Sequence, residues 1–395
     1  MDPVRNPYAP GAGQRPPELA GRDAELATFD VLLERIPRGR PERSVVLTGL
    51  RGVGKTVLLN ALRSSAVRRG WGTGKLEARP DQTIRRPLAA ALHLAIRELA
   101  GRNPDEAAHV LGVVKSFAQR ADGAKGRQWQ PGIDVPAVPG RADSGDIETD
   151  LVELFSDVAG LAGEGGHGIA IFMDEMQDLG ADDVSALCAA CHEVSQQSLP
   201  LVVVGAGLPH LPTVLSASKS YSERLFRYAR IDRLDRAAHD LALRAPARDE
   251  DADFTDDALA AMYEVTGGYP YFVQAYGKVA WDVAPRSPIT AADVAVAAPE
   301  ADAELAVGFF GSRYERATPA EREYLRAMAD VADTGADAGA DAVPTAAVAE
   351  SLGRPPQSLS PARDGLLKKG LVYSGQRGRI AFTVPHFGRY LLAQD

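Results

Sequence analysis

One run of eight residues, Gly49-Leu50-Arg51-Gly52-Val53-Gly54-Lys55-Thr56, fits the pattern G-x-x-x-x-G-K-[ST]. Glycines at these positions let backbone N–H groups curl around a phosphate, where any Cβ would intrude. A helix that begins after the loop adds its partial positive charge at the same place. Lys55 would then reach the β- and γ-phosphates, and the Thr56 hydroxyl would take a Mg²⁺ position. The run, together with the following Val57, therefore predicts a binding loop for a nucleoside triphosphate rather than a chance glycine-rich turn.

A pair of carboxylates follows a second apolar run, in Ile169-Ala170-Ile171-Phe172-Met173-Asp174-Glu175. Acids at the carboxyl end of a buried strand lie where open α/β sheets bind their ligands. Asp174 would hold Mg²⁺ through its water shell, and Glu175 would orient the water that attacks the γ-phosphate. A solvated acidic turn is the alternative, and the nearby phosphate-loop motif favours the catalytic interpretation.

The elements that must position these residues alternate between strands and helices. Apolar runs at Ser44–Thr48, Ile169–Met173 and Leu201–Val204 are short and continuous, which is typical of parallel strands covered on both faces. Helical periodicity falls at Ile84–Leu99, Ile147–Leu161 and Ala181–Gln197. We therefore predict a doubly wound α/β core with a parallel sheet.

Composition shifts divide the rest of the chain. Residues 1–20 hold five Pro and two Gly and predict a flexible leader. The core is expected over 21–235, with an exposed insertion at about 121–146, where eight of 26 residues are Gly or Pro. A helical lid is expected over 236–312. Residues 313–395 begin with the capping box Thr318-Pro319-Ala320-Glu321 and end in a hairpin, which predicts a winged helix-turn-helix domain.

Taken together, Gly21–Leu26, Gly49–Thr56 and Ile169–Glu175 resemble P-loop ATPases of the AAA+/STAND superclass, and especially the bacterial and archaeal ATPases related to origin-recognition initiators. The resemblance spans about residues 21–395. It implies ATP with Mg²⁺ as ligands, Arg22 near the adenine, and a G-x-P element at Gly268-Tyr269-Pro270 whose Pro270 packs near the base. A helix cap is an equally good reading of Arg22. GTP is disfavoured because no N-K-x-D motif is present.

Two departures from the family pattern bear on hydrolysis. The strand at Leu201–Val204 runs into Gly205-Ala206-Gly207, which offers no side chain where the family carries a polar sensor. No arginine occurs at 268–274, where the lid's second sensor is usual. Turnover is therefore expected to be slow or to await a partner. Arg224 is the candidate for a charge-stabilising arginine acting on a neighbour's nucleotide, with a plain surface arginine beside Glu223 as the alternative.

The C-terminal segment carries an excess of positive charge. Residues 351–395 hold seven basic and two acidic side chains, a net +5 inside a chain of −9. Such a face could place a helix in the major groove of double-stranded DNA. The alternative is a STAND-like signalling or scaffold ATPase with little or no intrinsic hydrolysis, whose winged helix holds the core closed and whose partner is another protein or a second copy.

Composition excludes several classes. The chain is 45% hydrophobic and 25% charged, which is typical of a globular protein. No apolar run approaches the roughly 18 residues of a membrane span, and no signal sequence is present, so we expect a cytoplasmic protein without a membrane partner. Cys188-Ala189-Ala190-Cys191-His192 matches a haem-attachment motif, but helical periodicity predicts buried core cysteines instead.

Overall fold

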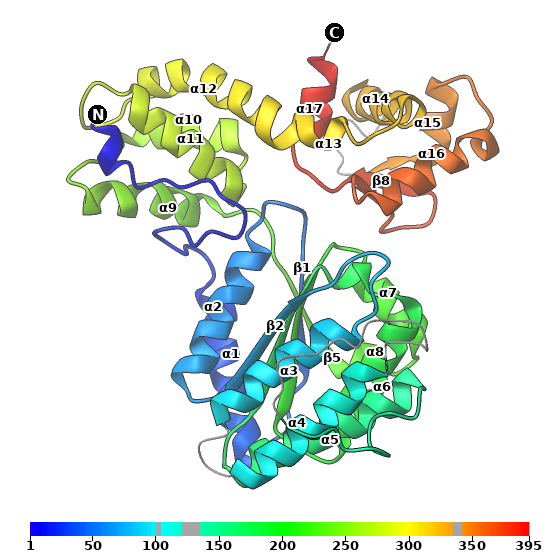
Figure 1. Ribbon diagram of the computed structural model, residues 1–395. Coiled ribbons are helices and arrows are strands. Elements are labelled where there is room, and N and C mark those ends of the chain that lie inside the picture. The colour runs from blue at the N-terminus through cyan, green and yellow to red at the C-terminus, as the bar shows by residue number, and fades with distance from the viewer. Residues whose placement is uncertain (100–103, 121–134, 335–341, 395) are drawn as a thin grey trace. The chain divides into compact units, whose positions relative to one another are not determined.

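The computed structural model describes residues 1–99, 104–120, 135–334 and 342–394, and its contacts divide the chain into two compact units (Figure 1). The sheet unit comprises residues 22–48 and 55–230. The helical unit comprises residues 1–21, 49–54 and 231–395. Residues 121–134 of the predicted insertion lie outside the described residues.

The sheet unit is built on five parallel strands. These are β1 (Ser44–Thr48), β2 (Gly72–Glu77), β3 (Ile169–Asp174), β4 (Leu201–Gly207) and β5 (Phe226–Arg230), in the order β2-β3-β4-β1-β5. The predicted α/β fold with a parallel sheet is confirmed. The strands β2 and β5 were not predicted, because the glycines and lysine of β2 and the arginines of β5 break the apolar run that identifies a buried strand.

Helices cover both faces of this sheet (Figure 1). They are α1 (Asp23–Arg35), α2 (Lys55–Arg68), α3 (Arg85–Leu99), α4 (Pro104–Gln119), α5 (Ile147–Glu164), α6 (Ala181–Gln196), α7 (Leu211–Ser218) and α8 (Ser222–Leu225), with short 3₁₀ turns η2 (Ile36–Arg38) and η3 (Met176–Asp178). On one face Phe29 of α1 contacts the ring of Phe172 edge-on, 6.2 Å between centroids. The opposite face, with Ile171 and Met173, packs in a core with α3 to α7.

Strand order places the catalytic candidates. The chain leaves β1 for the far edge at β2, returns through β3 and β4, and ends at β5 on the other side of β1. The order therefore reverses beside β1, and ligands of open α/β sheets bind at the carboxyl ends of the strands at such a point. The last residues of β1 and β3, Thr48 and Asp174, both lie at this edge of the sheet.

The helical unit begins with four longer helices, joined by a π-helical segment to a smaller α/β portion. Its elements are η1 (Pro3–Arg5), α9 (Arg236–Asp249), α10 (Asp256–Thr266), α11 (Pro270–Val283), α12 (Ala291–Leu305), the π-helix η4 (Ala306–Gly311), α13 (Ser312–Tyr314), α14 (Pro319–Thr334), β6 (Ala342–Pro344), α15 (Thr345–Ser351), α16 (Pro356–Lys368), β7 (Val372–Tyr373), β8 (Arg379–Phe382) and α17 (Phe387–Leu392). Three short antiparallel strands are ordered β6-β8-β7. The division into a lid (236–312) and a C-terminal domain (313–395) stays a prediction.

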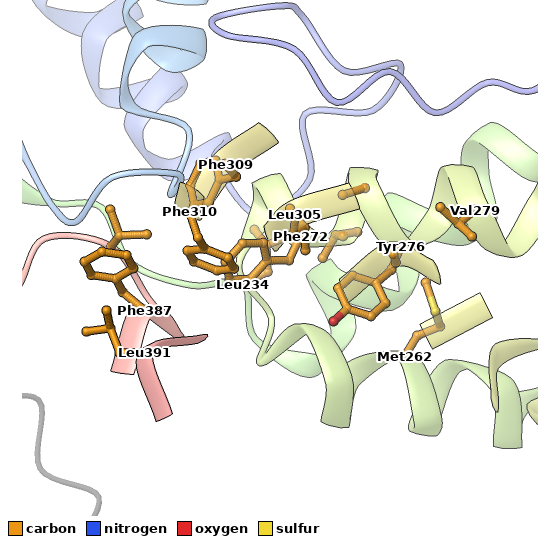
Figure 2. Close-up of a cluster of buried hydrophobic side chains, with 14 of the residues drawn as sticks. Leu234, Met262, Phe272, Tyr276, Val279, Leu305, Phe309, Phe310, Phe387 and Leu391 are labelled. Atoms are coloured by element: carbon orange, nitrogen blue, oxygen red, sulfur yellow. The ribbon is translucent and has the colours of Figure 1, made fainter. Parts of the chain in front are cut away.

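A cluster of aromatic side chains lies within the otherwise largely aliphatic core of the helical unit. Phe272 of α11 lies against Phe309 and Phe310 of the π-helix, and Phe310 stacks on Phe387 of α17 with 6.0 Å between centroids (Figure 2). Offset and edge-on ring pairs each add about 0.5–1.5 kcal/mol beyond the area they bury. The cluster thereby joins α11, η4 and α17 into one core.

The N-terminal residues are part of this core, and the predicted flexible leader is wrong. Tyr8 is 3% exposed, and its hydroxyl donates to the carbonyl of Leu243 at 2.6 Å. The indole of Trp281 donates to the carbonyl of Asp2 at 2.9 Å. The burial of the Tyr8 ring and the hydrogen bond of its hydroxyl hold this segment in place despite its Pro and Gly content. Composition could not predict this, because it does not show which single side chain packs into the core.

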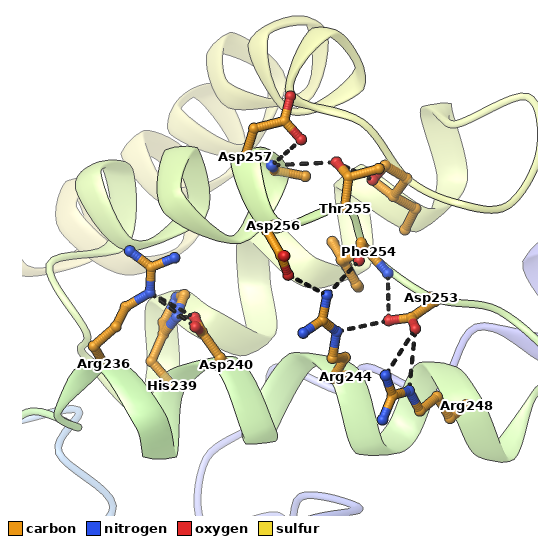
Figure 3. A network of polar contacts seen from close by, with 12 residues as sticks. Arg236, His239, Asp240, Arg244, Arg248, Asp253, Phe254, Thr255, Asp256 and Asp257 are labelled. Atoms are coloured by element: carbon orange, nitrogen blue, oxygen red, sulfur yellow. Dashed lines mark hydrogen bonds and ion pairs between the residues drawn. The ribbon is translucent and has the colours of Figure 1, made fainter.

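Polar contacts fasten the outer faces of the helical unit. Arg244 of α9 donates to Asp253, to the carbonyl of Phe254 and to Asp256, and Arg248 pairs with Asp253 (Figure 3). These pairs are partly exposed, so each contributes at most about 1 kcal/mol. No helix within the described residues is long and apolar enough to span a membrane.

Candidate nucleotide site

The loop between β1 and α2 has the backbone that its sequence predicts. Gly52 and Gly54 have φ of 84° and 88°, a region that L side chains rarely adopt. Gly49 is required for a different reason, since a Cβ there would lie 2.2 Å from the carbonyl oxygen of Ile231. Strand, loop and helix follow one another without a gap, because β1 ends at Thr48 and α2 begins at Lys55.

Residues 49–54 of the loop make their contacts inside the helical unit. The amide of Tyr271 donates to the carbonyl of Gly52 at 3.1 Å, and the amide of Arg51 donates to the carbonyl of Thr383 at 2.8 Å. The ring of Tyr271 stacks on Phe309, 4.5 Å between centroids. The guanidinium of Arg313 lies over the other ring of this pair, Phe309, at 4.2 Å. Burial, and then the nearby charge of Arg51, lower the pKa of Arg313.

A hydroxyl and a carboxylate meet at the start of α2, inside the sheet unit. The Thr56 hydroxyl donates to Oδ2 of Asp174 at 2.7 Å, and Asp174 is only 7% exposed. Lys55 is also buried, with 9% of its surface exposed. Mg²⁺ prefers oxygen ligands and usually keeps several waters and substrate phosphates around one or two protein side chains. The pair fits that requirement, and the described residues contain no cluster of three His, Cys, Asp or Glu side chains that would form an all-protein metal cage.

Glu175 has an unusual backbone. Its φ of 50° and ψ of 40° put a side chain other than glycine in the left-handed region, which is costly and recurs at functional sites. Its amide donates to Oδ1 of the neighbouring Asp174 at 2.9 Å. Asp174 therefore accepts from Thr56 with one oxygen and from Glu175 with the other, which fixes both acids relative to the start of α2.

Gln177 is a site residue that the sequence analysis missed. Its Nε2 donates to Oε2 of Glu175 at 2.6 Å, and its Oε1 accepts from the amide of Leu208 at 3.0 Å. The room for it comes from β4, since a Cβ on Gly207 would lie 2.7 Å from that Oε1. A Cβ on Gly205 would likewise meet the sulfur of Met176 at 1.9 Å. The available signal was a polar side chain two residues after the acidic pair, and only the structure shows that it faces the glycines of β4.

Two family models match the chain: an AAA ATPase domain over residues 18–204, and a domain of unknown function (DUF8462) over residues 307–391. Residues 18–204 form an AAA ATPase domain. Its motif residues Lys55, Thr56, Asp174 and Glu175 all lie within the match. A comparison with curated protein sequences found no significant match.

A comparison with solved structures found chains of similar fold. The Walker-type ATPase PABY2304 of Pyrococcus abyssi is 16% identical, with a TM-score of 0.58, and the alignment covers 96% of this chain and 97% of that one. The RuvB Holliday junction branch migration motor of Thermotoga maritima is 17% identical with a TM-score of 0.46, covering 97% and 100%. The Orc1 protein of Aeropyrum pernix, solved with DNA, is 15% identical with a TM-score of 0.45, covering 96% and 94%. At these identities the first match supports the fold alone, an α/β P-loop NTPase fold.

The remaining predicted residues lie in different places. In the AAA domain, Arg22 is buried, 8% exposed, and directly precedes α1, while Val57 is half-buried in the first turn of α2. Arg224 is exposed at the end of α8, just ahead of the edge strand β5. Pro270, in the helical unit, is the first residue of α11 and adjoins Tyr271, whose amide contacts the phosphate loop.

The cysteines of the haem-like motif lie in the core of the sheet unit. Cys188 and Cys191 are 0% and 7% exposed in α6, and burial raises the pKa of both thiols, that of Cys188 to about 11. Buried thiols of this kind are inert as nucleophiles and ligands. The interpretation as core cysteines therefore fits their surroundings.

Proposed function

We propose that this chain binds ATP with Mg²⁺ at the loop 49–56 and hydrolyses it slowly, as a switch whose nucleotide state acts on the C-terminal region. The observation that carries the proposal is the Thr56–Asp174 hydrogen bond, with Glu175 tied to the same carboxylate. A hydroxyl, an acid for the metal and an acid for the water at one strand end are the parts that γ-phosphate hydrolysis requires.

In the proposed reaction, the loop amides and Lys55 hold the phosphates, and Thr56 and Asp174 hold the metal and its water shell. Mg²⁺ supplies neutralisation of the charge that develops on the phosphates. Glu175 orients a water whose oxygen forms the new bond to the γ-phosphorus, while the bond to the bridging oxygen of ADP breaks. The proton of that water passes to the Glu175 carboxylate, and ADP and phosphate leave.

Three further residues receive proposed roles. Arg22 contacts the adenine, and Pro270 packs near it. Arg224 stabilises the transition-state charge on a neighbouring copy's nucleotide, for which its exposed position ahead of an edge strand is suitable. Homo-oligomerisation would then be necessary for full activity, which agrees with the slow turnover expected of the isolated chain.

Two substitutions test the ATPase proposal. Lys55→Ala should abolish measurable ATP binding by calorimetry, while Lys278→Ala, at a half-buried lysine paired with Asp282, should leave it unchanged. Glu175→Gln should retain ATP and lose phosphate release, whereas Glu264→Gln, on the exposed face of α10, should not. Tight ATP binding by Lys55→Ala would refute the proposal.

The nature of the output partner is a second question. The order α14, β6, α15, α16, β7, β8 is typical of a winged helix, and we propose that assignment for residues 313–395. Several of its basic side chains have acidic partners: Lys369 with Glu321, Arg354 with Glu323, and Arg363 with Asp364. This neutralisation favours the second candidate, a protein partner, over double-stranded DNA.

Fluorescence anisotropy with a labelled DNA duplex separates these candidates. A DNA-binding output predicts an affinity that falls steeply as salt rises, because phosphate contacts release counterions. No affinity for the duplex, or affinity independent of salt, supports the protein-partner candidate. Sizing by light scattering in ATP, ADP and no nucleotide, run on the same samples, reports whether a second copy is that partner.

A further inference from the structure

Gln177 lies beside the end of β4, and the last three residues of that strand carry no polar side chain. The strand ends in Gly205-Ala206-Gly207, and both glycines leave room for side chains from the turn η3, Met176 at the first and Gln177 at the second. The Gln177 amide bridges the carboxylate of Glu175 and the backbone of Leu208, which directly follows β4.

The chemistry of its two partners fixes the direction of the amide. The backbone N–H of Leu208 can only donate, so it must face Oε1 of Gln177. The amide nitrogen then points to Glu175, where it donates to Oε2 at 2.6 Å. The flipped amide would set an N–H against an N–H and a carbonyl oxygen against a carboxylate. Only one orientation satisfies both contacts.

We infer that Gln177 is a positioning residue that aims the Glu175 carboxylate and links it to the segment after β4. The inference rests on the proposed function, since it concerns the residue proposed to orient the attacking water. Two contacts of Glu175 bear on its orientation: its backbone is tied to Asp174, and its side chain is tied to Gln177. The second restraint is anchored on Leu208, so a movement of the turn between β4 and α7 moves the donor that holds Glu175.

Two substitutions of similar size separate positioning from simple structural support. Gln177→Glu keeps an oxygen for the Leu208 amide and replaces the donor to Glu175 by a second carboxylate. Gln177→Met loses both contacts. Gln196→Glu, the same chemical change at the exposed end of α6, is the matched control.

The readouts are kcat and KM for ATP, the pH profile of kcat, and hydrogen exchange of the peptide that contains Leu208. We expect both Gln177 variants to lower kcat by roughly 10- to 100-fold with little change in KM, the usual effect of removing a group that orients a reacting one. In Gln177→Glu the acidic limb of the kcat profile should also move to higher pH, because two adjacent carboxylates resist ionising together. Leu208 should exchange faster only in Gln177→Met.

A double-mutant cycle completes the test. If Gln177 acts through Glu175, then Gln177→Met should lower the residual single-turnover rate of Glu175→Gln by much less than it lowers the wild-type rate. Full activity and an unmoved pH profile in Gln177→Glu, with loss only in Gln177→Met, would assign Gln177 a structural role and overturn the inference. Failure of the ATPase proposal is distinct, because it shows as unchanged ATP binding in Lys55→Ala or unchanged turnover in Glu175→Gln.

Discussion

The two units of this chain bury different kinds of side chain. Among the described residues, the sheet unit buries six charged groups: Arg22, Lys55, Arg85, Asp150, Asp174 and Asp183. The helical unit buries one, Glu321, among its described residues, and its core is built of aliphatic side chains and a cluster of aromatic rings. Burying a charged group costs free energy unless the group is paired and hydrogen-bonded. The sheet unit must therefore compensate that cost at several positions, and the helical unit at one.

The residues of the candidate site are also divided between the two units. In the sheet unit Asp174 and Glu175 meet Thr56 and Gln177 within hydrogen-bonding distance, and Lys55 starts the same helix as Thr56. In the helical unit the phosphate-loop residues 49–54 contact backbone and aromatic groups. Residues 49–54 thus make their described contacts in the helical unit, and Lys55, Thr56, Asp174 and Glu175 belong to the sheet unit.

The largest expected effect concerns a buried ion pair in the sheet unit. Asp150 is fully buried and accepts from Arg85 at 2.7 Å and from the amide and hydroxyl of Ser144 at 2.7 and 2.6 Å. Asp150→Ala leaves Arg85 buried without its acid, which should lower the free energy of unfolding of the sheet unit by about 3–5 kcal/mol.

Urea unfolding, monitored by hydrogen exchange of peptides from each unit, measures that loss of unfolding free energy. Asp157→Ala, on the same helix α5, removes a more exposed pair with Arg141 and should cost less than about 1 kcal/mol. If the two variants lower the unfolding free energy equally, the buried Arg85–Asp150 pair stabilises the sheet unit no more than an exposed pair does. The buried charges would then not distinguish the two units in stability.

The second prediction concerns turnover rather than stability. Asp174→Asn keeps a hydrogen-bond acceptor for Thr56 but removes the negative charge near the metal position. We expect kcat to fall by roughly 10- to 100-fold, as for changes at groups around a metal, while the melting temperature changes little. Malachite-green phosphate release across a Mg²⁺ titration measures this, with the exposed Asp182→Asn as control. Unchanged turnover at limiting Mg²⁺ would remove Asp174 from the metal site.

The sequence predicted the phosphate loop and the acidic pair better than it predicted the strands and side chains around them. The phosphate loop and acidic pair have strict spacing, because a phosphate and its metal admit few arrangements, and the strands before them are continuous apolar runs. The edge strands β5 and β2 are not continuous apolar runs, because β5 has arginines at 227 and 230 and β2 contains two glycines. Neither strand could therefore be recognised by its apolar pattern. Gln177 could not be predicted as a neighbour of Leu208, since that contact depends on β3 and β4 being adjacent in the sheet.

The helical unit should respond to acid through its buried carboxylate. The Glu321 carboxylate accepts from the amide of Thr318 at 2.6 Å, and the amide of Glu321 donates to the Thr318 hydroxyl at 3.4 Å, which confirms the predicted capping box. The same carboxylate pairs with Lys369. Burial alone would raise its pKa, but the bonds to Lys369 and Thr318 outweigh burial and lower it below the ordinary 4.5. A lowered pKa means that ionised Glu321 stabilises the unit above about pH 4.5, and that this stability is lost as pH falls through the lower folded value.

Thermal unfolding between pH 3 and 6 tests this prediction. Glu321→Gln should lower the melting temperature at pH 6 and flatten its decline toward pH 3. Glu323→Gln, whose partner Arg354 is exposed, should leave the wild-type pH dependence intact. A wild-type slope that persists in Glu321→Gln would mean that other acids control the acid sensitivity of the helical unit.

The smallest expected effect tests whether the N-terminal residues belong to the helical unit. Tyr8→Phe keeps the ring among Phe254 and Trp281 but removes the hydroxyl that donates to Leu243 at 2.6 Å. The buried carbonyl left without this donor should cost about 1 kcal/mol of unfolding free energy. Val4→Ala, at a side chain that is 92% exposed, should cost nothing measurable. If both variants unfold at the wild-type urea midpoint, the hydrogen bond from Tyr8 to Leu243 contributes no stability, and the N-terminal residues are not anchored through it.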